Sequence, residues 1–460
     1  MACTHKVLEQ HQVRPPPSSV PTTSLPLTFF DIPLLASDGV RCLYFYEFSH
    51  HFTQTVLPTL AHSLSLTLQH FFPLVGNLIC PPPPANPYIF YTQGDSIPLT
   101  IAESTAIFDH LTGYQPRDIK DFSHLVPKFP PTQMANDTFV FPLLAIQVTL
   151  FPNSGICVAV TNRHVIDGRI RSLFMKSWAS IFKAGGHDSS CLDKSLRPFY
   201  DRDAIRDPNG VMAVFLEEYF VRMRSKWKKD IGNTDLFSGD DSVKATYVLN
   251  RANIERLKQR CEKDNESSST PQHFSSFVIT CAFIWVCRMK TQYHEGAIDD
   301  DDELCYLAFA ADCRNRLEFP VPLTYFGNCL ASCKAAAKTS ELVGEKGFVV
   351  AAKVVARAIS KLKSKPLEGA EKWIEDRKNL IGKGHGRVLI VGGSPSFSDY
   401  QTDFGWGRPK KFEFINHPIF ISLADCRDDE GALEVGVVLR TRASMDTFSS
   451  IFEQALNLPY

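Results

Sequence analysis

The fold is decided by Ile156-Cys-Val-Ala-Val-Thr-Asn-Arg-His-Val-Ile-Asp-Gly168, where an apolar run gives way to a histidine and an Asp-Gly pair. Residues 156–160 are short, largely β-branched and apolar on both faces, which is typical of a central strand. Residues 169–183 carry apolar side chains at helical spacing, so a helix is predicted there. His164 is therefore predicted to lie at a corner between a strand and a helix.

A histidine at such a corner can act as a base. The corner holds the side chain on a rigid scaffold and leaves it facing a cleft. A neutral imidazole there accepts a proton near physiological pH. The chain contains 14 histidines, however, and most of them must be structural or lie on the surface. Position alone leaves two interpretations of His164 open, a catalytic base and a structural residue.

The chain is long enough for two hydrophobic cores. It has 460 residues, and a single core stops growing at roughly 250–300 residues. Its 44% hydrophobic and 22% charged residues are typical of a globular protein. Between residues 185 and 240 the pattern changes to Gly, Asp, Pro and charge clusters, which indicates a linker. We predict an N-terminal domain over residues 1–190, a crossover linker over 191–240 and a C-terminal domain over 241–460.

The overall charge argues against several kinds of partner. The 49 Lys and Arg against 50 Asp and Glu give a formal net charge of −1, with no electrostatic basis for binding nucleic acid or an anionic membrane. The 13 cysteines are scattered without a C-x-x-C pair, which indicates a reducing compartment and no zinc site. No stretch approaches the ~18 apolar residues of a membrane span, and the N-terminus lacks the apolar core of a signal peptide. The sequence predicts a soluble, cytoplasmic protein that binds a small molecule.

Each half of the chain mixes strands and helices in a similar way. In the first half a helix is predicted over residues 55–71, and strands over 40–46 and 141–151, the latter pairing with 156–160 as a hairpin. In the second half the predicted helices are 252–261, 274–289 and 348–363, and the predicted strands are 243–249, 304–311, 387–391, 419–423 and 433–439. Two related α/β domains with a cleft between them are expected.

Two motifs together give the chain a family resemblance. His164 with Asp167-Gly168 lies in the first half, and Asp403-Phe-Gly-Trp-Gly407 follows roughly 240 residues later. The histidine pattern alone arises often by chance, but the pair in a chain of this length is specific. On these residues the sequence resembles the plant BAHD family of CoA-dependent acyltransferases. The resemblance covers essentially the whole chain, because Phe71-Phe-Pro-Leu-Val-Gly76 is also similar to the end of a family helix.

Within that family, Tyr325-Phe-Gly-Asn-Cys329 is similar to a signature of the anthocyanin and phenolic glucoside acyltransferases, several of which use malonyl-CoA. The resemblance implies an α/β fold of two similar mixed-sheet domains, like chloramphenicol acetyltransferase, with an active-site channel between them. It also implies a monomer without a metal or a bound cofactor. Acyl-CoA, and by the branch malonyl-CoA, would be the cosubstrate.

The resemblance assigns roles to the matching residues. His164 would remove a proton from an acceptor hydroxyl or amine, which then attacks the thioester carbonyl of acyl-CoA. Asp167 would hold the corner with its carboxylate turned away from the cleft, and Gly168 would let the backbone turn. Asp403 would pair with an arginine such as Arg314. The other members of the second motif would lock that segment and allow close packing: Gly405, Trp406 and Gly407.

The first motif departs from the family in its spacing. Two residues separate His164 from Asp167, where the family has three. Aligned from the strand, His164 keeps the catalytic position and the corner is one residue shorter. Aligned from Asp167, Arg163 takes that position, and a guanidinium cannot serve as a base near neutral pH. We favour the first alignment, because loop corners absorb single deletions more readily than strands do.

Arg171 is the predicted contact for the acyl donor. Arg169 and Arg171 open the helix after the corner, and about one turn past Asp167 places Arg171 near the cleft side. Some malonyltransferases of the resembling branch have an arginine here, which implies that Arg171 binds the free malonyl carboxylate as a bidentate pair. The alternative is a surface arginine.

The sequence leaves three functions open. The first is transfer of malonyl from malonyl-CoA to a hydroxyl of a phenolic or flavonoid (anthocyanin) glucoside. The second is acetyl or malonyl transfer to an alkaloid or another specialised hydroxyl or amine. The third is a member that transfers nothing, either a binding protein or a lyase, because the corner is one residue short. The acceptor itself is not predicted, since no motif marks the loops that would form its pocket.

Overall fold

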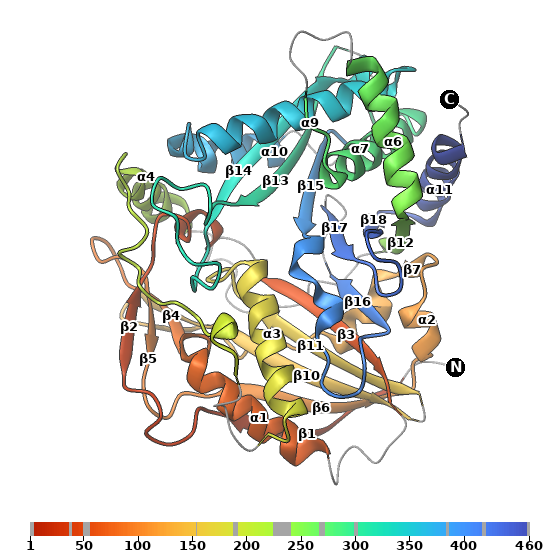
Figure 1. Cartoon of the computed structure of the whole chain (residues 1–460). Helices are drawn as coiled ribbons and strands as arrows, with labels where there is room; N and C mark the ends of the chain where they lie inside the picture. The colour runs from red at the N-terminus through yellow and green to blue at the C-terminus, as the bar shows by residue number, and fades with distance from the viewer. Residues whose placement is uncertain are drawn as a thin grey trace.

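A computed structural model of the chain describes residues 4–35, 39–48, 56–152, 154–186, 192–223, 241–265, 272–298, 302–382, 386–415 and 420–457. Within them the strands form three sheets, of six, seven and five strands. Figure 1 shows the six-stranded sheet in the lower half of the view and helices packed on both large sheets. Parallel and antiparallel pairs occur in the same sheets, so the predicted mixed α/β class is confirmed. The predicted linker lies partly outside the described residues, at 191 and 224–240.

The six-stranded sheet contains the stretch from which the fold was predicted. β10 and β11 form the expected hairpin, paired from Phe151 and Gly155 to Leu144 and Asn162 without a bulge. Every residue of β11 is buried, as expected of a central strand. The strand order is β1 (His5–Val13), β6 (Ile97–Ser104), β10 (Leu144–Phe151), β11 (Gly155–Asn162), β3 (Val40–Glu47) and β16 (Lys411–Phe414).

Neighbouring residues of β11 face two different cores. Val158 belongs to the largest apolar cluster, together with residues of α1 (Leu57–His70) and α3 (Gly168–Lys183). Cys157 belongs to a smaller cluster on the opposite face, which includes residues of α2 (Phe108–Thr112) and of the 3-10 helix Ile119–Leu125. This division follows from the two-residue period of a strand. Because both faces are packed, β11 is a rigid support for the corner that follows it.

The seven-stranded sheet forms the core of the second half. α7 (Ser276–His294) is buried around most of its circumference, which confirms the predicted buried helix. α6 (Arg251–Asn265), α9 (Gly347–Ser364) and α11 (Arg442–Asn457) share its apolar cluster, and α8 (Thr339–Val343) precedes α9. The strand order is β14 (Leu330–Lys338), β13 (Leu304–Asp312), β15 (Val388–Gly393), β17 (Phe420–Asp425), β18 (Leu433–Leu439), β12 (Val243–Leu249) and β7 (Arg117–Asp118).

A third, five-stranded sheet was not expected from the sequence. Its inward residues, such as Leu78 and Phe139, belong to the same cluster as the face of β11 that carries Val158. It therefore extends the first core and does not form one of its own. The strand order is β2 (Thr23–Pro26), β5 (Tyr88–Tyr91), β4 (Asn77–Cys80), β9 (Thr138–Pro142) and β8 (Gln133–Ala135).

The two halves of the chain exchange strands. β16, from the second half, pairs antiparallel with β3 at the edge of the first sheet. β7, from the first half, pairs antiparallel with β12 at the edge of the second sheet. The division at residues 191–240 stays a prediction, but each large sheet contains a strand from the other side of it.

Buried ion pairs lie where the exchanged strands meet. Glu413 of β16 accepts from Arg117 of β7 at 2.8 Å and from Lys244 of β12 at 3.1 Å. Burial alone would raise the pKa of Glu413, but the nearby Lys244, Arg117 and Lys411 lower it to about 2. Lys411 also pairs with Glu434 at 2.6 Å. These contacts join the two halves through charges that solvent does not reach.

Candidate active site

The predicted corner is a short turn between β11 and α3. β11 ends at Asn162, the N–H of Arg163 donates to the carbonyl of Leu143 at 3.0 Å, and the helix begins at Gly168. Asp167 is the N-cap of α3, and its Oδ1 accepts from the N–H of Ile170 at 3.2 Å. His164 therefore lies between a buried strand and a capped helix, as expected.

The other oxygen of Asp167 ties the corner to the second half of the chain. Oδ2 lies 2.7 Å from Nη1 of Arg314 and accepts from the N–H of Cys329 at 3.3 Å. Both charged side chains are nearly inaccessible to solvent, at 2% and 0% exposure. Burial would lower the pKa of Arg314, but the carboxylate of Asp167 beside it raises that pKa above its ordinary value. The prediction that Arg314 pairs with Asp403 is wrong, because Asp167 and Asp312 occupy its guanidinium.

Gly168 has a different role from the one predicted. It begins α3 with a φ outside the left-handed region, so the turn itself does not require a glycine. A Cβ at this position would lie 2.5 Å from the ring of Phe397. The missing side chain therefore allows Phe397 to pack against the start of the helix.

His164 is half-buried and its backbone is fixed. Its carbonyl accepts from Nδ2 of Asn328 at 2.8 Å. Burial and the positive charges of Arg377 and Arg41 lower the pKa of the imidazole to about 3. The ring is therefore neutral at physiological pH, the form in which one ring nitrogen carries a lone pair. Within the described part of the chain, no protein group is hydrogen-bonded to either ring nitrogen.

Arg163 is held away from the corner by two aromatic rings. Its guanidinium lies 4.8 Å from the ring centre of Phe129 and 4.7 Å from that of Phe141. Its Nε donates to the carbonyl of Pro142 at 2.9 Å. These contacts tie Arg163 to β9 and to the segment that precedes β8.

The segment Tyr325-Phe-Gly-Asn-Cys329 forms hydrogen bonds with residues that the sequence did not place near it. Asp31 accepts from the N–H and the side-chain amide of Asn328, at 3.1 and 2.9 Å, and its other oxygen lies 3.6 Å from Nη1 of Arg202. Arg202 also donates to the hydroxyl of Tyr325 at 2.9 Å. The segment was known only as a branch signature, and nothing in the sequence placed Asp31 or Arg202 beside it.

Arg171 is not on a cleft, so its predicted placement is wrong. It forms a bidentate pair with Asp399, with distances of 3.1 and 3.0 Å, and both side chains are 3% exposed. The hydroxyl of Tyr44 bonds to both partners. Arg169 instead donates from Nε to Asp312 at 2.7 Å. Both arginines that open α3 are thus engaged by carboxylates of the second half.

The second motif forms a compact loop against the first core. Oδ1 of Asp403 accepts from the N–H groups of Gly405 and Gly407, at 2.7 and 2.9 Å, and Oδ2 accepts from Lys183 at 2.6 Å. Gly405 and Gly407 have φ values of 90° and 88°, which favour glycine. The rings of Phe404 and Trp406 stack 5.1 Å apart. The geometry agrees with the structural role that the resemblance implied, but the partner of Asp403 is a lysine.

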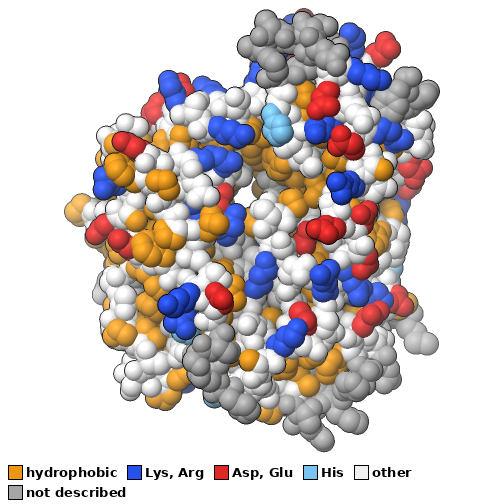
Figure 2. All heavy atoms as spheres, viewed as in Figure 1, with side chains coloured by type: hydrophobic (Ala, Val, Ile, Leu, Met, Phe, Trp, Pro, Cys, Tyr) orange, Lys and Arg blue, Asp and Glu red, His pale blue; other side chains and the backbone are white. Residues whose placement is uncertain are grey.

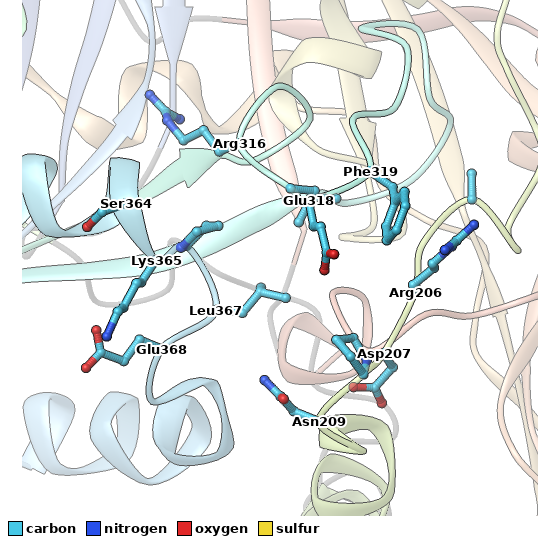
Figure 3. A pocket seen from close by; sticks show the side chains of 14 residues that line it. Arg206, Asp207, Asn209, Arg316, Glu318, Phe319, Ser364, Lys365, Leu367 and Glu368 are labelled. Carbon is cyan, nitrogen blue, oxygen red and sulfur yellow. The ribbon is translucent and has the colours of Figure 1, made fainter.

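An open cavity of about 690 Å³ lies beside this framework. It is lined by Ala204 and by residues 206–209, 316–319 and 364–368 (Figure 3). Neither His164 nor Arg171 is among its lining residues.

The described residues contain no group of His, Cys, Asp and Glu side chains placed to hold a metal ion. Over the same residues, no helix is long and apolar enough to cross a membrane. Figure 2 shows basic and acidic side chains interspersed over one face of the molecule, without a large patch of one sign.

The fold defines a class of protein. Vinorine synthase superposes with a TM-score of 0.69 over 96% of this chain and 96% of its own, at 17% identity. TRI101 of F. sporotrichioides, solved with coenzyme A and T-2, superposes with a TM-score of 0.64 over 93% of this chain and 97% of its own, at 15% identity. At these identities the likeness concerns the fold, and it confirms the predicted two-domain fold of the chloramphenicol acetyltransferase type.

The sequence comparisons define the family. A model described as the Transferase family matches residues 7–455. A malonyl-coenzyme A:anthocyanin 3-O-glucoside-6''-O-malonyltransferase of Dahlia pinnata is 37% identical over 98% of this chain and 97% of its own. Phenolic glucoside malonyltransferase 1 of Nicotiana tabacum is 38% identical over 89% of each chain, and a coumaroyl-CoA:anthocyanidin 3-O-glucoside-6''-O-coumaroyltransferase of Arabidopsis thaliana is 36% identical over 98% and 97%. The chain belongs to this family, the BAHD acyltransferases, and is an acyl-CoA-dependent acyltransferase.

Proposed function

We propose that this acyltransferase moves malonyl from malonyl-CoA to a hydroxyl of a phenolic or flavonoid (anthocyanin) glucoside, with His164 as the base. The observation that carries the proposal is the neutral, half-buried imidazole at the corner of α3, whose ring nitrogens have no protein partner among the described residues. The relatives at 36–38% identity support the substrate class, because their names specify glucosides of phenolics, anthocyanins or anthocyanidins.

The imidazole of His164 takes the proton of the acceptor hydroxyl as its oxygen attacks the thioester carbonyl carbon. The tetrahedral intermediate then collapses, the C–S bond breaks, and the imidazolium returns the proton to the departing sulfur. The products are the acyl ester and CoA-SH. Asp167 and Asn328 position the base through the helix cap and the backbone carbonyl, and they do not exchange protons with the substrate.

Two observations support His164, and not Arg163, at the catalytic position. β11 pairs with β10 without a bulge up to Asn162, so the shortening relative to the family falls in the turn and not in the strand. Arg163 is held between Phe129 and Phe141, where its charge is stabilised by the ring faces.

Malonyl as the acyl group rests on the relatives, because the cation predicted to bind its carboxylate is engaged by Asp399. Arg377 and Arg41 are the two arginines whose charges lower the pKa of His164. A second candidate donor is an uncharged acyl such as coumaroyl, which one relative uses by name. The buried pair of Arg171 with Asp399 favours this second candidate, since it needs no free cation.

We also propose that the enzyme works as a cytoplasmic monomer with no bound cofactor. The family resemblance and a formal net charge of −1 support this, and the acceptor and acyl-CoA would then be its only small-molecule partners.

The proposal is tested by incubating the purified chain with malonyl-CoA, acetyl-CoA and coumaroyl-CoA against a panel of phenolic and flavonoid glucosides. We expect release of free CoA thiol that depends on the glucoside, together with a product whose mass is raised by one acyl group. Acylation of amines or alkaloid hydroxyls alone would contradict the glucoside assignment. A preference for coumaroyl-CoA would keep the acceptor class and replace the donor.

A further inference from the structure

Arg288 of α7 is a buried cation without a partner in the described part of the chain. Only 4% of it is exposed, because it lies in the stretch of α7 that is buried around most of its circumference. It makes no hydrogen bond or ion pair with any described residue. Taking a guanidinium out of water is costly unless an anion accompanies it.

Other buried arginines show what such a group needs. Three of comparable burial each contact a buried carboxylate, at 2.8, 3.0 and 2.7 Å: Arg117 with Glu413, Arg171 with Asp399 and Arg314 with Asp167. The carboxylate whose charge acts on Arg288 is that of Glu295, which is exposed and accepts instead from Nε2 of Gln292 at 3.0 Å. Among the described residues Arg288 therefore has the burial of these arginines but not their counter-ion.

The guanidinium of Arg288 is positively charged at neutral pH. Burial lowers its pKa to about 10, the charge of Glu295 acts to raise the pKa, and the charge of Arg440 acts to lower it. A group with this pKa is protonated near pH 7, so it keeps all of its N–H donors. Because a second cation acts on it, an anion in this region is attracted by both charges.

Arg440 lies between β18 and α11, directly after the last residue of the strand. α11 packs against α7, with the ring centres of Phe452 and Phe283 5.3 Å apart (Figure 1). Arg440 is exposed, and it makes no hydrogen bond or ion pair with the described residues. Two arginines from different elements thus act on one region, and neither is neutralised by a paired carboxylate there.

A second buried donor lies beside Arg288. Nε1 of Trp285 is inaccessible to solvent and has no hydrogen-bond partner among the described residues. Trp285 and Arg288 are one turn apart on α7, which makes them neighbours on the surface of the helix. An indole N–H and a guanidinium donate hydrogen bonds and accept none. A partner for them has to be an acceptor, and the charge of Arg288 favours one that is an anion.

We propose that Arg288 and Arg440 form a binding site for a phosphate group, whose oxygens accept from the two guanidiniums. A phosphate group presents several acceptor oxygens, and these match the planar fork of an arginine. Inorganic phosphate and the phosphates of CoA share this chemistry. The inference goes beyond the proposed function, because it uses none of the residues assigned to acyl transfer.

The site is tested by the Tm of the full chain with and without inorganic phosphate, at an ionic strength matched with chloride. Phosphate stabilises folded proteins in general because it is excluded from their surface, so the readout is the difference between wild type and variant. We expect phosphate to raise the Tm of the wild type by roughly 2–4 °C more than that of Arg288→Met, because it binds only the folded wild type. Equal shifts in the two proteins would overturn the proposal.

Arg288→Met should also change the Tm in buffer without phosphate. Methionine fills the buried position without an unpaired charge, so the variant should melt at or above the Tm of the wild type. A clearly lower Tm would show that the protein itself already compensates the charge of Arg288, which would also overturn the proposal.

Arg440→Ala tests the site without altering the core, because Arg440 is exposed. It should lose most of the phosphate-specific rise in Tm. Arg357→Ala is the matched control, since Arg357 is an exposed arginine of α9, and it should keep the full rise. A full rise in Arg440→Ala, or an equal loss in Arg357→Ala, would contradict a site made by these two arginines.

The KM for acyl-CoA distinguishes the two sources of the phosphate group. If the group belongs to CoA, Arg288→Met should raise this KM by about 10-fold or more, and inorganic phosphate should compete with acyl-CoA in the wild type. If the group is inorganic phosphate, neither change should alter the KM, and the difference in Tm remains. Both results support the site, and each assigns its ligand.

Discussion

Asp167 and Asp403 are the carboxylates of the two family motifs, and both fix a chain segment by accepting backbone N–H groups, but their surroundings differ. Asp167 is 2% exposed, and its second oxygen meets Arg314 and Cys329 from the other half of the chain. Asp403 is 26% exposed, and its charged partner is Lys183, which is 57% exposed. Asp167 joins the two halves of the chain at the corner that carries His164, whereas Asp403 closes a loop on the surface of the first core.

A motif residue contributes to stability according to its burial and its partners. When one member of a buried ion pair is removed, the charge of the other member stays buried without a partner. This costs several kcal/mol of folding free energy. An exposed pair is replaced by water at little cost. The two aspartates should therefore respond to the same substitution by different amounts.

Asp167→Ala should have the largest effect on stability. It leaves the buried guanidinium of Arg314 with only Asp312 as a partner and removes the cap of α3. We expect the free energy of unfolding to fall by about 3–5 kcal/mol, measured by urea titration of the purified variant. Asp167→Asn keeps an oxygen for the helix cap and should lose less. A urea midpoint of Asp167→Ala equal to that of the wild type would show that the buried pair does not stabilise the protein.

Arg171→Ala should come second. Asp399 loses its bidentate partner but keeps the hydroxyl of Tyr44, so the expected loss is about 3 kcal/mol. Because the guanidinium is engaged by Asp399, the ratio of kcat/KM for malonyl-CoA to that for acetyl-CoA should stay within a few-fold of the wild type. A selective loss of the malonyl reaction would restore Arg171 as the contact for the donor carboxylate.

Asp403→Ala should have a smaller effect than either. It removes the acceptor for the N–H groups of Gly405 and Gly407, which water can reach in part. The expected loss is about 1–2 kcal/mol, read from the same titration. If Asp403→Ala destabilised the protein as much as Asp167→Ala, burial would not explain the difference between the motifs.

Lys183→Ala should have the smallest effect. Its ammonium contacts Asp403 on the surface, and such pairs contribute less than about 1 kcal/mol. High salt should change the wild type and this variant alike. A loss as large as that of Asp403→Ala would show that the lysine, and not the backbone contacts, holds the loop.

The local parts of this architecture could be predicted from the sequence. The apolar run of β11, its hairpin with β10 and the periodicity of α3 each lie within a few consecutive residues, so the corner followed from pattern alone, whereas the helix cap made by Asp167 was not predicted. α7 was equally clear, since an apolar stretch of helical length has no alternative but burial.

The partners of the charged residues could not be predicted. Arg314 meets Asp167 and not Asp403, and Arg171 meets Asp399, because these contacts depend on how the two halves stack. No periodicity in either half encodes that arrangement. The exchanged strands β7 and β16 were missed because two and four residues give too short a pattern.

β14 was missed for a different reason. It alternates small buried residues such as Ala335 and Ala337 with exposed ones such as Lys334 and Lys338, and neither alanine nor lysine favours a strand by itself. Its pairing with β13 over the full length of both strands supplies what the side chains do not.

The assignment of His164 as the base is tested by the rate of acyl transfer of His164→Ala, measured beside that of Arg163→Ala with acyl-CoA and acceptor saturating. A general base contributes about 10²- to 10⁴-fold, so kcat of His164→Ala should fall by at least about 100-fold while its urea midpoint stays near the wild-type value. Arg163→Ala should lose stability with the contacts to Phe129 and Phe141 and keep kcat within a few-fold. Wild-type turnover by His164→Ala, or an equal loss of kcat in Arg163→Ala, would contradict the assignment of His164 as the base.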